Sequence, residues 1–155
     1  SCHSFYPADP ALYGELFRPN ETVGRLVDAY AAHFTPHTVG VHIRRTDNAA
    51  SIARSPLSLF IEEMEREVAA HADTLFFVAS DSEEDKRALR AHFGDRILTS
   101  DRPADRSSLA GMQEGAVDFF TLSRTRRIIG SYYSSFSEVA ALIRGIPYHC
   151  TASRL

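Results

Sequence analysis

The stretch VGVHIRRTDN, residues 39–48, decides the fold class, because in it a short apolar strand runs directly into a charged loop. In an open α/β sheet, ligands bind just beyond the carboxyl ends of the strands. Arg44 and Arg45 stand at that point, and the planar guanidinium of arginine fits phosphate oxygens bidentately. The stretch therefore predicts a phosphate-recognition loop, with surface charges at a strand end as the alternative.

Strand-like and helix-like patterns alternate along the rest of the chain. After an irregular opening, we expect strands over residues 38–43, 74–79, 96–99, 127–130 and 146–149. We expect a polar loop after the first strand. One helix is expected to be capped by Asn20, one to start at Ser55-Pro56, and one to run from a cap at Ser82 to a stop at Gly94. Two more helices are expected over residues 115–124 and 136–144.

Alternation of this kind calls for a parallel sheet with right-handed crossovers. The predicted fold class is therefore α/β, with a Rossmann-like parallel sheet and flanking helices. We expect a single domain over residues 1–155, with a leading segment and helix over 1–37 and the alternating β/α core over 38–150. This architecture hosts many activities, so it does not supply a function by itself.

The composition is that of an ordinary globular domain, with 44% hydrophobic and 24% charged residues and a formal net charge of −3. The absence of a basic run argues against nucleic acid as a partner. No apolar run reaches the ~20 residues of a membrane helix, and the first residues do not resemble a signal peptide, so we expect a cytoplasmic protein. Cys2 and Cys150 are expected to be reduced thiols.

Several polar side chains are expected to converge where the strands end. His42, Arg44 and Arg45 belong to the end of the first strand, and Asp81 to the end of the second. The fourth strand is followed by a serine-rich segment that opens a helix and contains Ser134, Ser135 and Phe136. Amides and hydroxyls at a helix start bind phosphate oxygens, although plain N-capping explains the same serines.

Two acidic features leave alternatives open. Asp118 lies on an otherwise apolar helix face, so it needs either a structural ion pair or a ligand such as a nucleobase amine. Asp81 and Glu83 directly follow a strand and are suited to bind magnesium or manganese, although Ser82 followed by acids is also how a helix begins. The chain has no metalloprotease, hydrolase-elbow, Walker or dinucleotide-binding motif.

Three segments in order resemble the motifs of one family. They are HIRRTD over 42–47, FFVASD over 76–81, and VDFFTLS over 117–123 running on to IGSYYSSFSEVA over 129–140. Together they resemble the α1,6-, α1,2- and protein O-fucosyltransferase superfamily, including the bacterial nodulation fucosyltransferases of rhizobia. The resemblance spans roughly residues 38 to 145.

This resemblance implies a GT-B glycosyltransferase whose C-terminal Rossmann half holds GDP-fucose. It implies inverting transfer to a glycan or other hydroxyl acceptor, with no cofactor and no required metal. Arg44 would be catalytic, binding the β-phosphate and stabilising the departing GDP. The substrate-binding roles would fall to His42 and Arg45 around the nucleotide, Asp118 on the guanine, Asp81 near the nucleoside, and Ser134, Ser135 and Phe136 around the diphosphate.

The chain departs from the family pattern in two respects. Asn48 stands where α1,6 members place a lysine, which leaves the branch open. A GT-B enzyme also has a second, acceptor-binding Rossmann domain, for which 155 residues leave no room. The chain is therefore expected to be one part of a longer enzyme or a stand-alone remnant. The other hypotheses are a catalytically silent nucleotide-sugar or phosphate-binding module, and a metal-dependent transferase using Asp81 and Glu83.

Overall fold

The computed structural model describes residues 10–46, 49–100 and 108–153. Its centre is a five-stranded sheet in the order β3-β2-β1-β4-β5, with every neighbouring pair parallel. The strands are β1 (Val39–Ile43), β2 (Phe76–Ser80), β3 (Ile97–Leu98), β4 (Arg127–Ser131) and β5 (Tyr148–Thr151). This arrangement confirms the predicted α/β class with a Rossmann-like parallel sheet.

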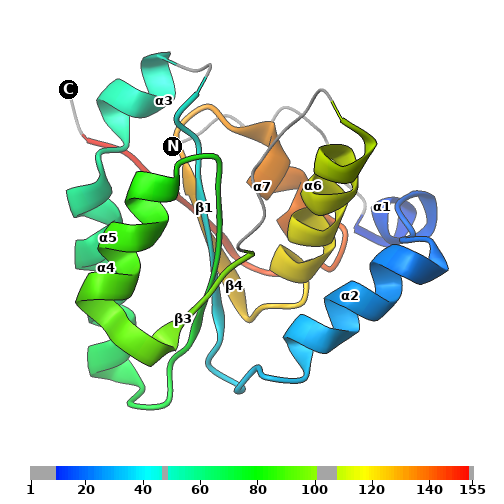
Figure 1. The fold of residues 1–155 in the computed structure, drawn as a ribbon, viewed down its shortest axis with the longest axis horizontal. Helices are drawn as coiled ribbons and strands as arrows, with labels where there is room; N and C mark the ends of the chain where they lie inside the picture. Colours follow the sequence, from blue (N-terminus) through cyan, green and yellow to red (C-terminus); the bar gives the residue numbers. More distant parts are fainter. Residues whose placement is uncertain (1–9, 47–48, 101–107, 154–155) are drawn as a thin grey trace.

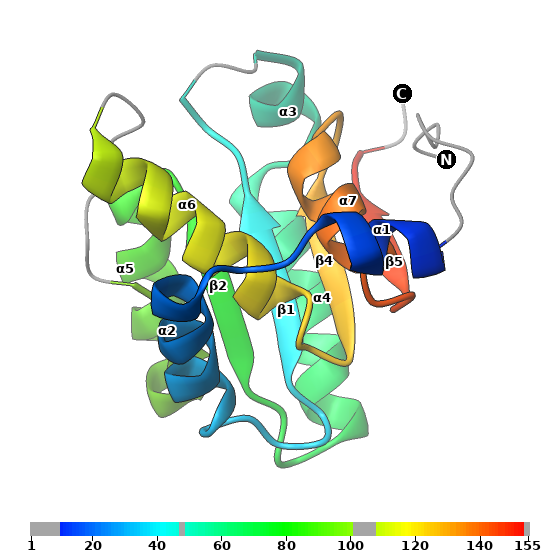
Figure 2. The same cartoon turned by 90° about the vertical axis from the view of Figure 1, so that its right-hand side faces the viewer.

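Helices cover both faces of the sheet (Figures 1 and 2). The helices are α1 (Pro10–Leu16), α2 (Glu21–Ala31), α3 (Ala49–Arg54), α4 (Leu57–Ala70), α5 (Glu83–Phe93), α6 (Leu109–Leu122) and α7 (Ser135–Leu142), with a 3₁₀ turn over Gly94–Arg96. Helices α4 and α5 lie on one face, and α2, α6 and α7 lie on the other. The chain therefore has the three layers of a doubly wound domain.

The two faces have separate cores, because alternate residues of a strand point to opposite sides. Val39, Val41 and Ile43 of β1 pack with Phe60 and Met64 of α4 on one side. On the other side, residues of β2 and β4 pack with buried residues of α6 and α7, among them Phe77, Ile128, Leu122 and Ala140. All five residues of β1 are buried, as the apolar pattern of a central parallel strand requires.

The order of the strands creates one point at which the chain changes direction across the sheet. From β1 the chain moves outward to β2 and β3, and it then crosses back to place β4 on the other side of β1. At such a switch point the loops after the two adjacent strands diverge and leave a crevice, which is where ligands of this class of fold bind. The switch point here lies beyond Ile43 and Ser131, the last residues of β1 and β4.

The sequence predicted several helix ends correctly. The side chain of Asn20 caps α2 by accepting from the N–H of Val23 at 2.9 Å. The Ser82 hydroxyl caps α5 in the same way, accepting from the N–H of Asp85 at 3.2 Å. Gly94 ends α5 with φ of 59°, a backbone conformation that glycine adopts without the Cβ penalty of other residues.

Other expectations about local structure were wrong. Ser55 does not cap α4, since Pro56 holds the cap position without a side-chain bond and the Ser55 hydroxyl serves other partners. The segment after β1, expected to be a polar loop, contains α3. Helix α6 begins at Leu109, capped by Ser108, rather than near residue 115, and α1 occupies part of the opening expected to be irregular.

Cys150 is disulfide-bonded, so the expectation of a reduced thiol is wrong for this residue. Cys2 lies outside the described residues, as do Asp47 and Asn48. Disulfides persist mainly in oxidising compartments, so the state of Cys150 does not support the cytoplasmic expectation. Within residues 10–46, 49–100 and 108–153, no helix is both long and apolar enough to cross a bilayer.

Candidate functional site

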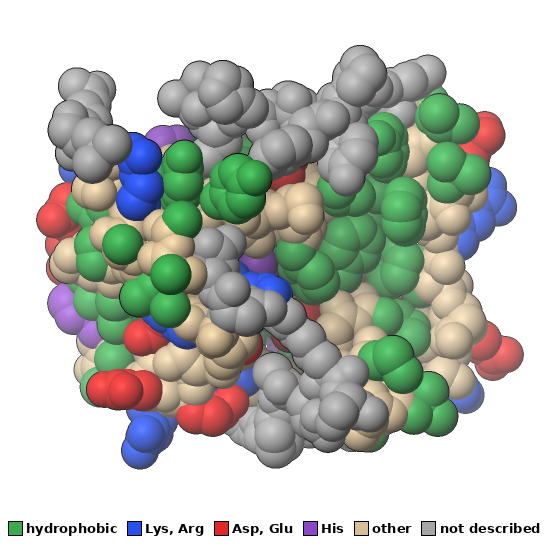
Figure 3. Space-filling model, turned by 90° about the horizontal axis from the view of Figure 1, so that it is seen from above, with side chains coloured by type: hydrophobic (Ala, Val, Ile, Leu, Met, Phe, Trp, Pro, Cys, Tyr) green, Lys and Arg blue, Asp and Glu red, His purple; other side chains and the backbone are tan. Residues whose placement is uncertain are grey.

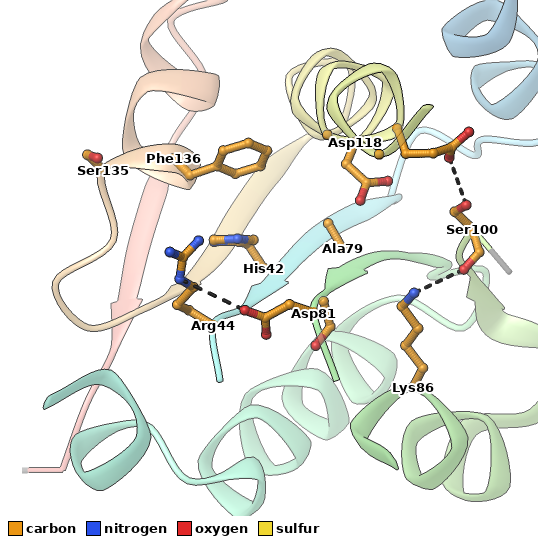
Figure 4. Close-up of a pocket in the computed structure, with 13 residues that line it drawn as sticks. His42, Arg44, Ala79, Asp81, Lys86, Ser100, Asp118, Ser135 and Phe136 are labelled. Carbon is orange, nitrogen blue, oxygen red and sulfur yellow. Dashed lines mark hydrogen bonds and ion pairs between the residues drawn. The ribbon is translucent and has the colours of Figure 1, made fainter. Parts of the chain in front are cut away.

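A cavity of about 370 Å³ opens at the carboxyl ends of the strands. It lies beyond β1 and β2 and between α5, α6 and the start of α7 (Figure 4). Figure 3 views the molecule onto this face, where basic and histidine side chains lie between hydrophobic ones. Six of the predicted site residues line the cavity, namely His42, Arg44, Asp81, Asp118, Ser135 and Phe136.

Arg44 is the first residue after β1, and its backbone is fixed on two sides. Its N–H donates to the hydroxyl of Ser131 at the end of β4, at 3.0 Å. Its carbonyl accepts from the hydroxyl of Ser51 in α3, at 3.2 Å. The guanidinium lines the cavity, with Nε 3.9 Å from the nearer carboxylate oxygen of Asp81. The strand thus presents this guanidinium at the switch point between β1 and β4.

Asp81 holds the loop that follows Arg44. One carboxylate oxygen accepts from the N–H of Arg45 at 2.7 Å, and the other accepts from the hydroxyl and N–H of Thr46 at 2.7 and 3.2 Å. Burial of Asp81 raises its pKa, but the hydrogen bonds from Thr46 and Arg45 and the charge of Arg44 outweigh burial, so the pKa lies below its ordinary value. Asp81 is therefore ionised at neutral pH.

Arg45 points away from the cavity, although it neighbours Arg44. Its Nε donates to a carboxylate oxygen of Asp85 at 2.6 Å, and its Nη1 donates to the carbonyl of Ser55 at 2.8 Å. These contacts join the β1 loop to α5 and to the α3–α4 junction. The structure therefore gives Arg45 a bracing position, and the nucleotide-binding role implied for it stays a prediction.

His42 and the start of α7 form the wall opposite α5. The buried His42 ring has Nδ1 3.2 Å from the hydroxyl of Ser137 and 3.4 Å from that of Ser134. Its ring centroid lies 4.8 Å from that of Phe136. Ser135 and Phe136 line the cavity, whereas Ser134 lies behind them against His42. Helix α7 therefore brings its first turn, whose amides have no partner within the helix, to the edge of the cavity.

Gly130 allows Ser137 of α7 and Tyr148 of β5 to pack close to β4. A Cβ at this position of β4 would lie 2.5 Å from the Ser137 hydroxyl and 2.7 Å from the ring of Tyr148. Real side chains do not approach this closely, so α7 and β5 reach their positions because residue 130 has no side chain.

Asp118 lies on the third wall, which is formed by α6. Its carboxyl points into the cavity (Figure 4), and its Oδ1 is buried without a hydrogen-bond partner among the described residues. Burial raises the pKa of Asp118 to about 7; the nearby Lys86 opposes this shift and Glu114 adds to it. The structural ion pair considered for Asp118 does not form with any described residue.

A polar cluster beside Asp118 was not predicted from the sequence. Lys86 is buried, and its Nζ donates to a carboxylate oxygen of Glu83 at 2.8 Å and to the carbonyl of Ser100 at 3.1 Å. The Ser100 hydroxyl donates to a carboxylate oxygen of Glu114 at 2.9 Å. Two signals were present: Lys86 is the single lysine of the chain, and Glu114 precedes Asp118 by one helical turn.

Asp81 and Glu83, the two acidic residues considered as metal ligands, contact different parts of the protein. Asp81 binds the loop after β1, whereas Glu83 pairs with Lys86. Within the parts of the chain that the structure describes, no group of three or more histidine, cysteine or acidic side chains is arranged to hold a metal ion.

No protein-family model and no curated protein sequence matches this chain. Solved structures do match it. The α1,6-fucosyltransferase NodZ co-crystallised with GDP gives a TM-score of 0.58 at 22% identity, over 80% of this chain and 42% of that one. A structure of NodZ from Bradyrhizobium gives 0.62 at 21% identity, over 80% and 42%.

POFUT1 in complex with GDP-fucose gives a TM-score of 0.62 at 14% identity, over 96% of this chain and 51% of that one. This chain has the fold of part of these fucosyltransferases. It spans about half of their length, from 42% to 51% in these comparisons. At identities of 14% to 22% the likeness establishes the fold, and the activity has to be argued from the cavity.

Proposed function

We propose that this chain is the nucleotide-sugar-binding half of a fucosyltransferase and that its cavity binds GDP-fucose. The observation that carries the proposal is the pairing of two features across one cavity: the Arg44 guanidinium at the switch point and the Asp118 carboxyl on the facing helix. The structural likeness to NodZ with GDP and to POFUT1 with GDP-fucose supports it.

The diphosphate belongs at the Arg44 end of the cavity. Arg44 supplies a permanent positive charge in a bidentate geometry, and the first turn of α7 supplies amide donors beside Ser135. The rings of His42 and Phe136 lie beside each other in the wall next to this end of the cavity. Asp81, which is ionised, keeps the Arg44 loop in place rather than contacting the phosphates.

The guanine belongs at the Asp118 end. Guanine presents two neighbouring N–H donors on one edge, N1–H and the 2-amino group, and a carboxylate accepts both. The Asp118 Oδ1 atom is buried without a partner among the described residues, and such an oxygen is costly unless a ligand supplies a donor. Uracil has one N–H on the corresponding edge, between two carbonyl oxygens that a carboxylate repels, so this end favours guanine over uracil.

Transfer of fucose requires stabilisation of the negative charge that develops on GDP as the donor is cleaved. The bond between fucose C1 and the phosphate oxygen cleaves, and its electron pair goes to the β-phosphate. A preorganised guanidinium at that oxygen is worth ~3 kcal/mol of barrier, by comparison with the loss of one oxyanion donor. We propose that Arg44 fills this role without a metal. The acceptor hydroxyl attacks the opposite face of C1, which forms the new C1–O bond with inverted configuration, and GDP departs while the hydroxyl proton is released to solvent.

The second candidate is a catalytically silent module that binds the same nucleotide. It is considered because the likeness to NodZ and POFUT1, at 22% and 14% identity, supports the fold and not the activity. Both candidates predict GDP binding. They differ in turnover, because the silent module releases no GDP from GDP-fucose when an acceptor is supplied.

Calorimetric titration with GDP, GDP-fucose and UDP, each with and without EDTA, tests the site. We expect GDP to bind at least about tenfold more tightly than UDP, since a site that loses one paired N–H discards roughly 1.4 kcal/mol or more. EDTA should leave the GDP affinity unchanged. Equal affinity for GDP and UDP contradicts the proposed base recognition, and loss of binding in EDTA moves the function to the metal-dependent alternative.

A further inference from the structure

Ser55 connects three of the loops that surround the switch point. It is fully buried at the junction of α3 and α4. Its hydroxyl donates to the carbonyl of Thr151, at the end of β5, and accepts from the N–H of Tyr132, directly after β4, at 2.8 Å. Its carbonyl accepts from Nη1 of Arg45, directly after Arg44, at 2.8 Å.

These contacts reach both walls of the diphosphate end. Tyr132 begins the turn that leads into α7, and its neighbour Tyr133 has φ of 55°, which is rare for a residue with a side chain. The turn therefore needs outside support to keep this shape. A second contact supplies some of it, since the Arg54 guanidinium lies 4.5 Å from the centroid of the Tyr132 ring.

The chemistry of serine suits this position. A hydroxyl donates once and accepts twice, so one small side chain satisfies a carbonyl and an N–H that belong to different loops. Alanine at residue 55 would leave the carbonyl of Thr151 and the N–H of Tyr132 without this partner inside a closed site.

We propose that Ser55 is a positioning residue for the diphosphate end of the cavity, holding the loops after β1, β4 and β5 so that Arg44 and the first turn of α7 face the same ligand. This inference rests on the proposed function. Ser55 does not line the cavity, and none of its hydrogen bonds between described residues reaches α6, which carries Asp118. It therefore acts on phosphate binding and not on base binding.

Calorimetric titration of wild type and Ser55→Ala with GDP and with guanosine tests this role. GDP uses both ends of the cavity, whereas guanosine uses the Asp118 end alone. We expect Ser55→Ala to lower the GDP affinity about tenfold and to change the guanosine affinity less than about twofold. Ser55→Cys keeps a weak donor and acceptor of similar size, so it should lose about threefold toward GDP.

Thr74→Val is the matched control. Thr74 is also fully buried, and its hydroxyl donates to the backbone carbonyls of Glu67 and His71 beyond the opposite end of the sheet. This variant should lose thermal stability and bind GDP like wild type. A folded Ser55→Ala or Ser55→Cys with an unchanged ratio of GDP to guanosine affinity overturns the positioning role. A wild-type protein that fails to prefer GDP over UDP overturns the proposed function instead.

Discussion

Glu67 and Asp118 are two acidic residues near opposite ends of the same sheet, and their surroundings differ. Glu67 lies in the last turn of α4, near the start of β4, where it forms ion pairs with both Arg126 and Arg127, the latter at 2.9 Å. Asp118 lies at the cavity beyond the carboxyl ends of the strands, and its buried Oδ1 has no described partner.

The two residues differ in their contribution to stability: Glu67 is ion-paired within the protein, whereas Asp118 has a buried oxygen that lacks a described hydrogen-bond donor. A carboxylate paired with two arginines contributes to folding, because its charge is compensated within the chain. An uncompensated buried carboxyl opposes folding whenever it is ionised. The Asp118 carboxyl, at the carboxyl end of the sheet, therefore lowers the stability of the folded protein, and a ligand with N–H donors would offset this loss.

The largest expected effect concerns Asp118. Because its folded pKa of about 7 lies above the ordinary 3.8, the folded protein holds a proton that the unfolded chain has released between those values. Wild-type stability therefore falls as pH rises from about 4 to 7, and the full penalty remains above pH 7. Asp118→Asn removes this dependence and should be more stable than wild type by on the order of 3 kcal/mol at pH 8.

Urea denaturation of wild type and Asp118→Asn at pH 5 and pH 8 measures this effect. The two proteins share all other groups, so the contributions of those groups cancel in the difference. A stability difference that is the same at both pH values would show that Asp118 is not held in its protonated form, and the contrast with Glu67 would fail.

The next effect compares the twin arginines. Arg44→Lys keeps the charge and loses the bidentate fork, so we expect GDP affinity to fall roughly 30-fold, about 2 kcal/mol, with little change in stability. Arg45→Lys is the matched control, because its partners are Asp85 and Ser55 within the protein. It should lose thermal stability and lose only about threefold in GDP affinity, because its contact with Ser55 reaches the diphosphate end indirectly.

Calorimetric titration with GDP and thermal denaturation of both variants provide the two readouts. Full GDP affinity in Arg44→Lys would remove Arg44 from the phosphate site. A large loss of GDP affinity in a stable Arg45→Lys would restore the nucleotide-binding role that the family resemblance implies for Arg45.

The smallest effect concerns Glu67. Glu67→Gln removes the charge from an ion-paired carboxylate whose arginine partners are partly exposed, so we expect a loss of about 1 kcal/mol of stability and no change in GDP affinity. Glu62→Gln is the control: its pair with Arg66 spans 3.9 Å between exposed side chains, and its loss should be within ~0.5 kcal/mol. A change in GDP affinity in Glu67→Gln would mean that the two ends of the sheet are coupled.

The fold was largely predictable because its signals are local. The apolar run over 39–43, the Asn20 and Ser82 caps and Gly94 each act within a few residues. The misassigned elements depend on distant partners. Ser55 has the local pattern of a cap, but the ends of β4 and β5 compete for its hydroxyl. Helix α3 packs Ser51 against the backbone of Arg44, a contact that sequence spacing does not reveal.

The sequence predicted where the site lies but only some of the residues that line it. The strand ends locate His42 and Arg44, and the two-residue period of an extended strand places both side chains on the same side of the sheet. Which arginine of the pair faces the cavity depends on Asp85, a partner on another helix. Lys86 and Glu114 were missed because the faces that α5 and α6 turn toward the cavity follow from how these helices pack. The roles of all these residues stay predictions.

Gly130 makes the shape of this site difficult to change by small evolutionary steps. The smallest possible enlargement, to alanine, already meets the Ser137 hydroxyl and the Tyr148 ring, so β5 and α7 would both have to shift. No single substitution at residue 130 widens the diphosphate end gradually. The α6 wall around Asp118 has more freedom to change, because Gly115 has open space beside it.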